Sequence, residues 1–117
     1  MPNVSEIGDY AFGGCSSLTS VDMSNVNVIG GGAFGGCPLT SVDIPNVITI
    51  EGGAFGGCSS LTSVDMSNVT TISSAAFYNC PLNPVIIPSG VTEIGVEAFC
   101  GCHASEITIP GLVTEAD

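Results

Sequence analysis

Residues 39–58 spell one complete repeating unit, LTSVDIPNVITIEGGAFGGC. Its last five residues form the phrase Ala-Phe-x-x-Cys, which occurs five times along the 117-residue chain, and successive Phe residues lie 22, 21, 22 and 22 positions apart. Self-similarity at a period of this length is the sequence signature of a solenoid. We therefore predict that residues 1–117 form a single solenoid domain of five repeats, which start near Val4, Val26, Val47, Val69 and Val91.

Within each unit, an apolar–polar–apolar triplet such as Val42-Asp43-Ile44 predicts a short strand with one buried face. Turn-forming residues such as Pro45-Asn46 end it. The segment around Ala-Phe-x-x-Cys is rich in Gly, which costs about 1 kcal/mol relative to Ala inside a helix. We therefore expect a tight irregular or 3₁₀-like arc in that segment. Each repeat of about 22 residues should contribute one short parallel strand, and the coils should stack about 4.8 Å apart.

Stacking of identical coils predicts ladders of identical side chains in the core. The two clearest are a Phe ladder and a Cys ladder, made of Phe12, Phe34, Phe55, Phe77 and Phe99 and of Cys15, Cys37, Cys58, Cys80 and Cys102. Stacked cysteines would point in parallel rather than at each other, which is the wrong geometry for disulfides. We therefore expect small, buried, free thiols.

A metal site is not predicted. Structural zinc ligands come at short spacings, which a 21-residue period does not provide. Cys100-Gly101-Cys102-His103 resembles a metal motif, but it offers poor tetrahedral geometry and no fourth ligand. An ordinary exposed thiol is the favoured interpretation of Cys100, whose redox state stays open. His103 is the only histidine and has no partner for nucleophilic chemistry, so no catalytic residue is predicted.

The chain has no Lys and no Arg against eleven acids, a formal net charge of −11. Binding to phosphate groups relies on basic residues, which argues against nucleic acid and anionic lipid as partners. No apolar run approaches the roughly 20 residues of a transmembrane helix, so no membrane insertion is predicted. Met1-Pro2-Asn3-Val4 lacks the basic start and apolar core of a signal peptide.

A row of acids is predicted on the outward side of the strands. Asp22, Asp43 and Asp65 occupy the same position in three repeats, each two residues after Ser20, Ser41 or Ser63, and the row stops at Ile86 and Thr108. Stacking would place like charges about 5 Å apart, which destabilises the fold unless water or a cation screens them. Two interpretations remain open: a face for a basic protein partner or a weakly bound divalent cation, and a merely solvated surface. No other cofactor is indicated.

The two ends of the chain carry no polar capping segment, which solenoids normally need for solubility. Their core positions are Val4 and Ile7 at one end and Ile107, Ile109 and Val113 at the other, and Val113-Thr114-Glu115 repeats the phase of Val4-Ser5-Glu6. We expect unpaired strand edges at residues 21–23 and 107–109. Either the chain was cut at a repeat boundary, or copies stack head to tail, an arrangement that gives open filaments.

The full pattern, Leu-x-x-Val-x-Ile-Pro-x-x-Val-x-x-Ile-x-x-x-Ala-Phe-x-x-Cys, resembles the BspA-like leucine-rich-repeat family. It is carried here by Leu39, Val42, Ile44, Pro45, Val47, Ile50, Ala54, Phe55 and Cys58. Where the standard leucine-rich repeat has Asn or Cys, this chain has Val, as the BspA-like type implies. The resemblance implies a leucine-rich-repeat solenoid and a secreted or cell-surface location, since many such proteins are microbial surface proteins involved in adhesion.

The sequence as a whole favours a non-enzymatic extracellular module for protein binding or adhesion. The alternative is a self-assembling structural subunit that stacks into a filament or surface layer. Fold alone does not decide between the two.

Overall fold

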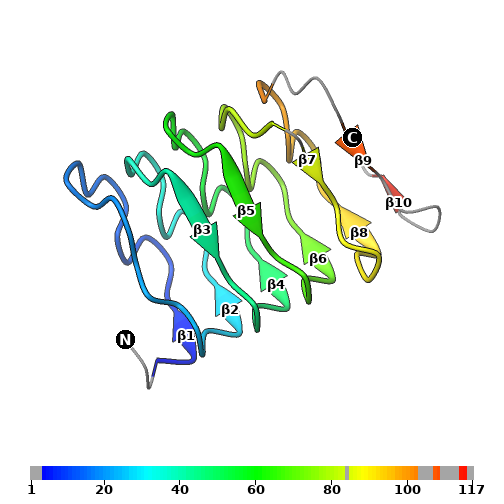
Figure 1. The fold of residues 1–117 in the computed structure, drawn as a ribbon, viewed down its shortest axis with the longest axis horizontal. Coiled ribbons are helices and arrows are strands. Elements are labelled where there is room, and N and C mark those ends of the chain that lie inside the picture. Colours follow the sequence, from blue (N-terminus) through cyan, green and yellow to red (C-terminus); the bar gives the residue numbers. More distant parts are fainter. Residues whose placement is uncertain (1–3, 84, 103–106, 109–113, 116–117) are drawn as a thin grey trace.

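The computed structural model describes residues 4–83, 85–102, 107–108 and 114–115. The chain winds into successive coils that stack side by side, and every regular element in the described residues is a strand of two or three residues (Figure 1). No helix among them is long and apolar enough to cross a membrane. The strands are β1 (Glu6–Ile7), β2 (Val28–Ile29), β3 (Ser41–Asp43), β4 (Thr49–Ile50), β5 (Ser63–Asp65), β6 (Thr71–Ile72), β7 (Val85–Ile86), β8 (Glu93–Ile94), β9 (Ile107–Thr108) and β10 (Thr114–Glu115). The predicted strand-based solenoid is confirmed.

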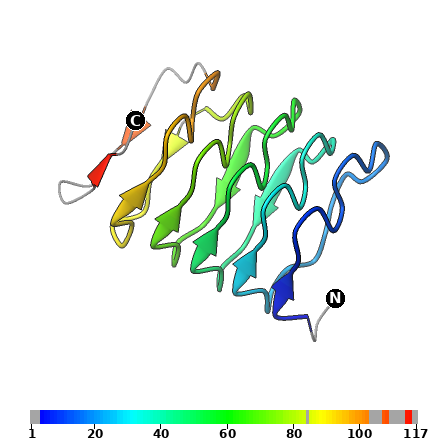
Figure 2. The same cartoon turned by 180° about the vertical axis from the view of Figure 1, so that it is seen from behind.

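Parallel strands pair from coil to coil along two faces of the solenoid (Figures 1 and 2). One face carries a six-stranded sheet in the order β1-β2-β4-β6-β8-β10, and the other carries two separate sheets, β3-β5 and β7-β9. The two smaller sheets contain the strands predicted from the triplets. The prediction of one strand per repeat is nevertheless wrong for the central coils, which contribute two each, because a two-residue strand is too short to show an alternating pattern.

The first coil differs from the prediction as well. Residues 20–23 lie outside any strand, so the expected strand edge at residues 21–23 is not there. The strand at the N-terminal edge of the large sheet is β1 instead. At the other end, β9 pairs with β7 in the predicted register, Val85 opposite Ile107 and Ile86 opposite Thr108.

A buried isoleucine sets the register of the six-stranded sheet. Ile7, Ile29, Ile50, Ile72 and Ile94 stand side by side and are all buried. In the last strand, however, Thr114 pairs with Glu93 and Glu115 with Ile94. The repeat alignment would instead place Glu115 opposite Glu93, so the prediction that both ends share one phase is wrong by one residue here. Register depends on a buried apolar side chain, and the sequence has only Ala116 at the aligned Ile position.

The Gly-rich arcs are runs of tight turns. In one arc, Ala33, Gly35 and Cys37 donate their backbone N–H groups to carbonyls three residues earlier, at 3.1–3.2 Å. The backbone becomes left-handed at Gly36 with φ 74° and at the matching Asn79 with φ 59°. Gly adopts this conformation without steric cost, and Asn tolerates it better than most residues. The predicted irregular arc is confirmed.

The core consists of the predicted ladders. Phe34, Phe55 and Phe77 are fully buried, and all five Phe rings stack with centroids 5.3–5.4 Å apart and planes within 10° of parallel. Phe12 and Phe99 are only partly buried because they lie nearer the ends of the stack. No polar or charged side chain among the described residues is buried, so apolar packing holds the coils together.

Candidate binding surface

The exposed side of β3 and β5 carries the predicted acidic row. Asp43 lies directly opposite Asp65, and Ser41 opposite Ser63, and all four side chains are exposed. Two carboxylates on paired strands repel each other. Without Lys or Arg anywhere in the chain, no side-chain ammonium or guanidinium can neutralise them. The pair is therefore a concentrated negative charge at the surface.

Asp22 does not extend this ladder as a strand residue. It lies in the irregular segment before the turn at Ser24 and Asn25, where its Oδ1 accepts a hydrogen bond from the backbone N–H of Ser24 at 3.1 Å. This bond lowers the pKa of Asp22 because it favours the ionised carboxylate. Ser20 is exposed in the same irregular segment. The strand-borne acidic row consequently has two members, and Asp22 serves its own turn.

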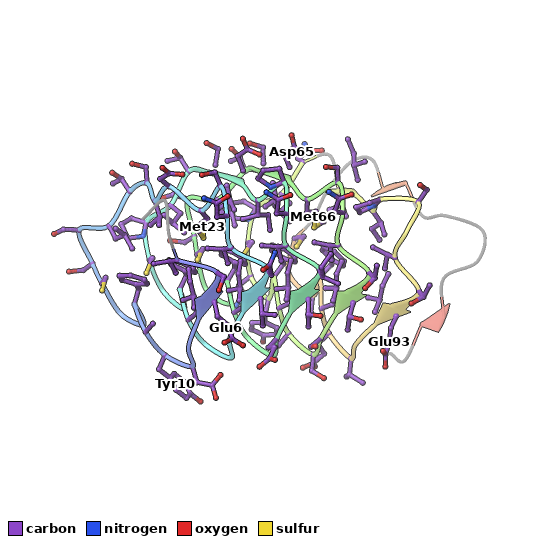
Figure 3. The ribbon with its side chains drawn as sticks, turned by 90° about the horizontal axis from the view of Figure 1, so that it is seen from below. Glu6, Tyr10, Met23, Asp65, Met66 and Glu93 are labelled. Carbon is purple, nitrogen blue, oxygen red and sulfur yellow. The ribbon has the colours of Figure 1, made fainter. Side chains whose placement is uncertain are left out.

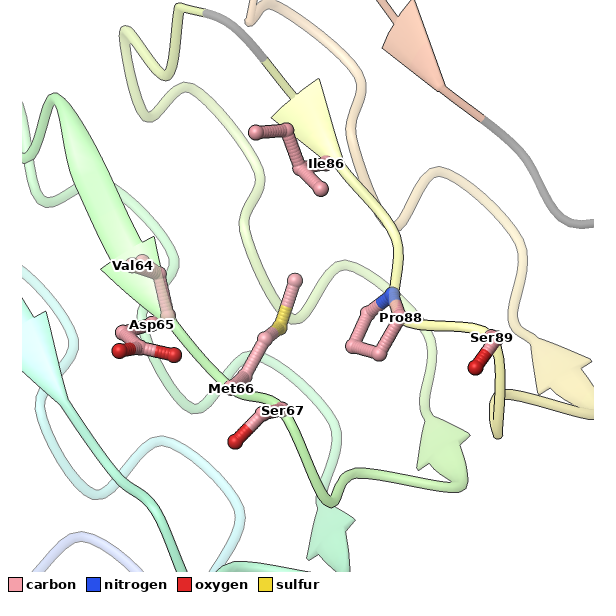
Figure 4. Close-up of a pocket in the computed structure, with 7 residues that line it drawn as sticks. All are labelled: Val64, Asp65, Met66, Ser67, Ile86, Pro88 and Ser89. Carbon is pink, nitrogen blue, oxygen red and sulfur yellow. The ribbon is translucent and has the colours of Figure 1, made fainter.

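A groove opens beside the acidic pair, where β5 and β7 fail to pair (Figure 4). It has a volume of about 440 Å³ and is lined by Val64, Asp65, Met66, Ser67, Ile86, Pro88 and Ser89. Figure 4 shows Met66 on the β5 side and Ile86 and Pro88 on the β7 side of the opening. Ile86 is 58% exposed, so it presents most of an aliphatic side chain to the opening.

Sequence reasoning missed this groove, although two signals marked it. Ile86 stands where three earlier repeats have Asp, and Pro84 stands where they have Ser. Proline has no backbone N–H and cannot donate to a strand ladder. The break in pairing follows Pro84 in sequence, but its consequence, an open space between two sheets, depends on how the neighbouring coils pack.

The acidic pair and the six-stranded sheet present two different surfaces. Figure 3 shows Asp65 projecting from one face and Glu6 and Glu93 from the other, with Met23 and Met66 between them. The outward positions of the large sheet align as Glu6, Val28, Thr49, Thr71 and Glu93. The two acids of that row are separated by three uncharged residues. Directly adjacent strand carboxylates occur only on the β3–β5 face among the described strands.

The Cys ladder is a structural feature. Cys37, Cys58, Cys80 and Cys102 are buried, and each thiol donates a hydrogen bond to the backbone carbonyl of a Phe in the preceding coil, with Sγ···O distances of 3.0, 3.1, 2.9 and 3.4 Å. Burial raises the pKa of Cys37 and Cys102. The hydrogen bond between the Cys58 and Cys80 thiols raises the pKa of Cys80 and lowers that of Cys58, so this pair holds one shared proton most firmly. A thiol held in its neutral form is a poor nucleophile.

The remaining cysteines lie at the margins of this ladder. Cys15 is partly buried in the first arc, and Cys100 is exposed. Within the described residues, no group of three or more His, Cys, Asp or Glu side chains is placed to hold a metal ion. His103, the third residue of the sequence motif around Cys100, lies outside the described residues.

The N-terminal coil leaves part of its core open. Phe12, Cys15, Leu18 and Val21 are partly buried, whereas Phe34, Cys37, Leu39 and Val42 in the next coil are buried. Of the predicted stacking residues, Ile7 is buried and Val4 partly buried. Ile107 belongs to β9, and Ile109 and Val113 lie outside the described residues. An apolar patch of partly exposed ladder residues thus faces outward from this end.

Comparison with known proteins identifies the family of repeats in the chain. A model of the BspA type leucine rich repeat region matches residues 1–116 with six copies, one more than the five counted from Ala-Phe-x-x-Cys. The chain is similar to the crystal structure of a leucine rich cell surface protein from Faecalibacterium prausnitzii A2-165, with 32% identity, a TM-score of 0.66, and coverage of 90% of this chain and 36% of that one.

It is also similar to a leucine-rich repeat protein from Bacteroides ovatus ATCC 8483, with 33% identity, a TM-score of 0.68, and coverage of 99% of this chain and 30% of that one. The chain therefore spans about a third of the length of these structures. Among curated proteins, none matches it. The repeat model extends over nearly every residue, and the chain belongs to the BspA type leucine-rich-repeat family.

Proposed function

We propose that this chain is a non-catalytic protein-binding module of a secreted or cell-surface protein, and that it binds through its strand face. The strand face is defined here as the exposed residues Ser41, Asp43, Ser63, Asp65 and Ile86 on β3, β5 and β7. The observation that carries the proposal is the register of Asp43 with Asp65 in a chain that has no Lys and no Arg.

Electrostatics indicates the kind of partner. Paired carboxylates are most stable when an opposite charge lies against them, and the chain has no Lys or Arg to supply it. A partner with Lys or Arg on its surface would be steered towards a domain of net charge −11. Solenoids commonly bind through such extended surfaces, and one similar structure is described as a cell surface protein.

The test is a selection from a random-peptide display library against the whole chain. We expect the selected peptides to be enriched in Lys and Arg, and to lose binding to the double variant Asp43→Asn with Asp65→Asn. The matched control is Glu93→Gln, which removes one acid from the opposite sheet. A selection that yields no specific binder, or only binders indifferent to the double variant, would contradict the proposal.

Head-to-tail self-association is a second candidate, supported by the partly exposed ladder residues of the first coil. A second copy stacked there would bury these side chains and continue the ladders. Light scattering at increasing concentration should then show a rising mass, more steeply at high salt because screening weakens repulsion between two strongly acidic copies.

Val21→Asp should block that growth, whereas Val96→Asp, which alters an exposed residue on a later arc, should leave it unchanged. A constant monomer mass at high concentration and high salt excludes stacking and leaves the binding module.

A further inference from the structure

The groove between β5 and β7 lies next to the acidic pair, and together they form a composite surface. The groove contributes apolar side chains from Val64, Met66, Ile86 and Pro88. Asp65 belongs to both parts, since it lines the groove and stands opposite Asp43. An apolar recess flanked by uncompensated negative charge suits a ligand that combines an aliphatic side chain with a cation.

The groove arises from an interruption of the strand ladder. On the other side of β5 the backbone pairing is complete, and the Ile44 N–H donates to the Asp65 carbonyl at 2.9 Å. Towards β7, the Asn83 N–H donates to the Thr62 carbonyl at 3.3 Å. The next backbone hydrogen bond between these two coils among the described residues is from Thr92 to Thr70. Between these bonds the coils separate, which leaves the recess.

The recess is large enough to admit a large aliphatic side chain. Its volume of about 440 Å³ lies in the range of roughly 300–1,000 Å³ typical of sites for small ligands. Ile86, 58% exposed, would gain most from being covered. Burying apolar area contributes roughly 25 cal/mol per Å², so an aliphatic side chain seated against Ile86 and Pro88 provides the apolar part of the affinity.

The spacing between the recess and the acidic pair fits an extended chain. Neighbouring coils are about 5.4 Å apart, as measured between stacked rings of Phe34 and Phe55. In an extended peptide, side chains two positions apart lie on one side and are separated by roughly 6.5–7 Å. A peptide that crosses the strands can therefore place one side chain in the recess and another over Asp43 and Asp65.

We propose that this composite surface binds an extended segment of a partner protein in which an arginine and a large aliphatic residue lie two positions apart. Arginine fits better than lysine because its planar guanidinium can bridge two carboxylates and is weakly hydrated. The inference rests on the proposed protein-binding function and assigns it one site and one ligand chemistry.

The probe is the blocked pentapeptide Gly-Arg-Ser-Leu-Gly, titrated into the isotopically labelled chain and followed by amide chemical shifts. We expect fast-exchange shifts concentrated at the amides of residues 64–67 and of Ile86, Ile87 and Ser89, with an affinity on the order of 1 mM. Replacing the peptide's Arg by Gln, or its Leu by Ala, should weaken binding about fivefold each. Moving Leu next to Arg should have a similar effect, because the two side chains then point to opposite sides.

Two variants of the protein test the two halves of the surface. Asp43→Asn with Asp65→Asn should remove the preference for Arg over Gln, and Ile86→Asp should remove the preference for Leu over Ala. Both alter exposed side chains, so the fold should persist, and melting temperatures close to that of the unmodified chain check this. Glu93→Gln and Val96→Asp are the matched controls and should change neither preference.

The outcomes separate this inference from the broader proposal. If displayed basic peptides require Asp43 and Asp65 but the pentapeptide shifts no groove residue, the groove site is wrong while the binding module stands. If shifts appear at the groove but are equal for the Arg and Gln peptides, the assigned ligand chemistry is wrong. If neither library nor pentapeptide binds, both proposals fail.

Discussion

Phe34 and Phe55 stack with their ring centroids 5.4 Å apart and their planes 6° from parallel. Both rings are fully buried, and each has a further ring on its other side. The rings stack nearly parallel because each coil is related to the next by a translation along the solenoid, with little rotation. The same translation places Asp43 beside Asp65 and each buried thiol beside a carbonyl of the preceding coil. One repeat distance therefore sets the spacing of both the core and the surface residues.

Phe55→Ala should unfold the protein or nearly so. The ring is fully buried in the middle of the stack, and Phe-to-Ala changes in a core cost roughly 3–5 kcal/mol against a total stability of roughly 5–15 kcal/mol. Thermal melting by circular dichroism measures the loss. Ile48→Ala, at a side chain that is 44% exposed, is the control and should change the melting temperature little. Equal effects of both changes would refute the core assignment.

Alkylation should distinguish Cys100 from the ladder cysteines. Cys100 is exposed, whereas the thiols of Cys37, Cys58 and Cys80 are buried and hydrogen-bonded. In the native protein, iodoacetamide should modify Cys100 on the order of a hundredfold faster, because buried thiols react only after local opening. Mass spectrometry of digested samples gives the rate at each site. In denaturant the difference should disappear, and its persistence there would point to a cause other than burial.

Stability should fall at alkaline pH. The native state holds Cys37, Cys80 and Cys102 with raised pKa values, so it favours the neutral thiols. This stabilisation is fully present below the ordinary thiol pKa near 9.0 and is lost as pH rises from there through the native pKa values. Each such thiol adds a slope of about 1.4 kcal/mol per pH unit.

Urea midpoints between about pH 8 and 10.5 measure that slope. Cys37→Ala should flatten it, because burial raises the pKa of Cys37, and Cys100→Ala, which removes an exposed thiol, should not. A slope insensitive to Cys37→Ala would show that this thiol does not oppose ionisation in the native state.

Two glycines should respond to alanine for different reasons. At Gly36 a Cβ would meet nothing within 4 Å, but the residue has φ 74°, so Gly36→Ala should cost only the left-handed penalty of about 1–2 kcal/mol. At Gly30 a Cβ would lie 2.7–2.8 Å from atoms of Asp9 and Gly8 in the preceding coil. Gly30→Ala must push two coils apart and should cost at least as much as an overpacked core, about 1–3 kcal/mol or more.

Denaturant titrations compare the two variants. Gly36→Asn should recover part of the loss of Gly36→Ala, since Asn79 occupies the matching position with φ 59°. No comparable rescue is expected at Gly30. If Gly30→Ala were the milder change, the close approach of the coils would be refuted.

Repulsion between Asp43 and Asp65 should make stability depend on salt. At low ionic strength, Asp65→Asn should raise the unfolding free energy by about 0.5 kcal/mol, and the gain should shrink as salt approaches about 1 M, where the screening length of about 3 Å is shorter than the separation of the two carboxylates. Melting temperatures in sodium chloride and in calcium chloride at equal ionic strength separate screening from binding. A larger rise with calcium that Asp65→Asn abolishes would support the weakly bound divalent cation.

The amino-acid sequence by itself determined the repeat, the ladders and the charge. A period of about 22 residues with apolar residues in constant phase leaves only stacking as a way to bury Phe55, Cys58 and their copies. The absence of Lys and Arg is likewise a property of composition. The conformational preferences of individual residues also predicted the irregular arcs, because Gly at positions such as Gly36 disfavours a helix and permits a positive φ.

Only the tertiary structure decided where these coils pair and where they do not. Two-residue strands such as β4 carry no alternation of their own and exist because neighbouring coils supply hydrogen-bond partners. Asp22 and Asp43 are identical in local sequence pattern, yet only Asp43 stands in a strand ladder. The groove beside Ile86 has the same origin, since it is the space between two coils whose ladder is interrupted. Pairing and its interruption belong to two segments about 22 residues apart, and neither segment specifies them alone.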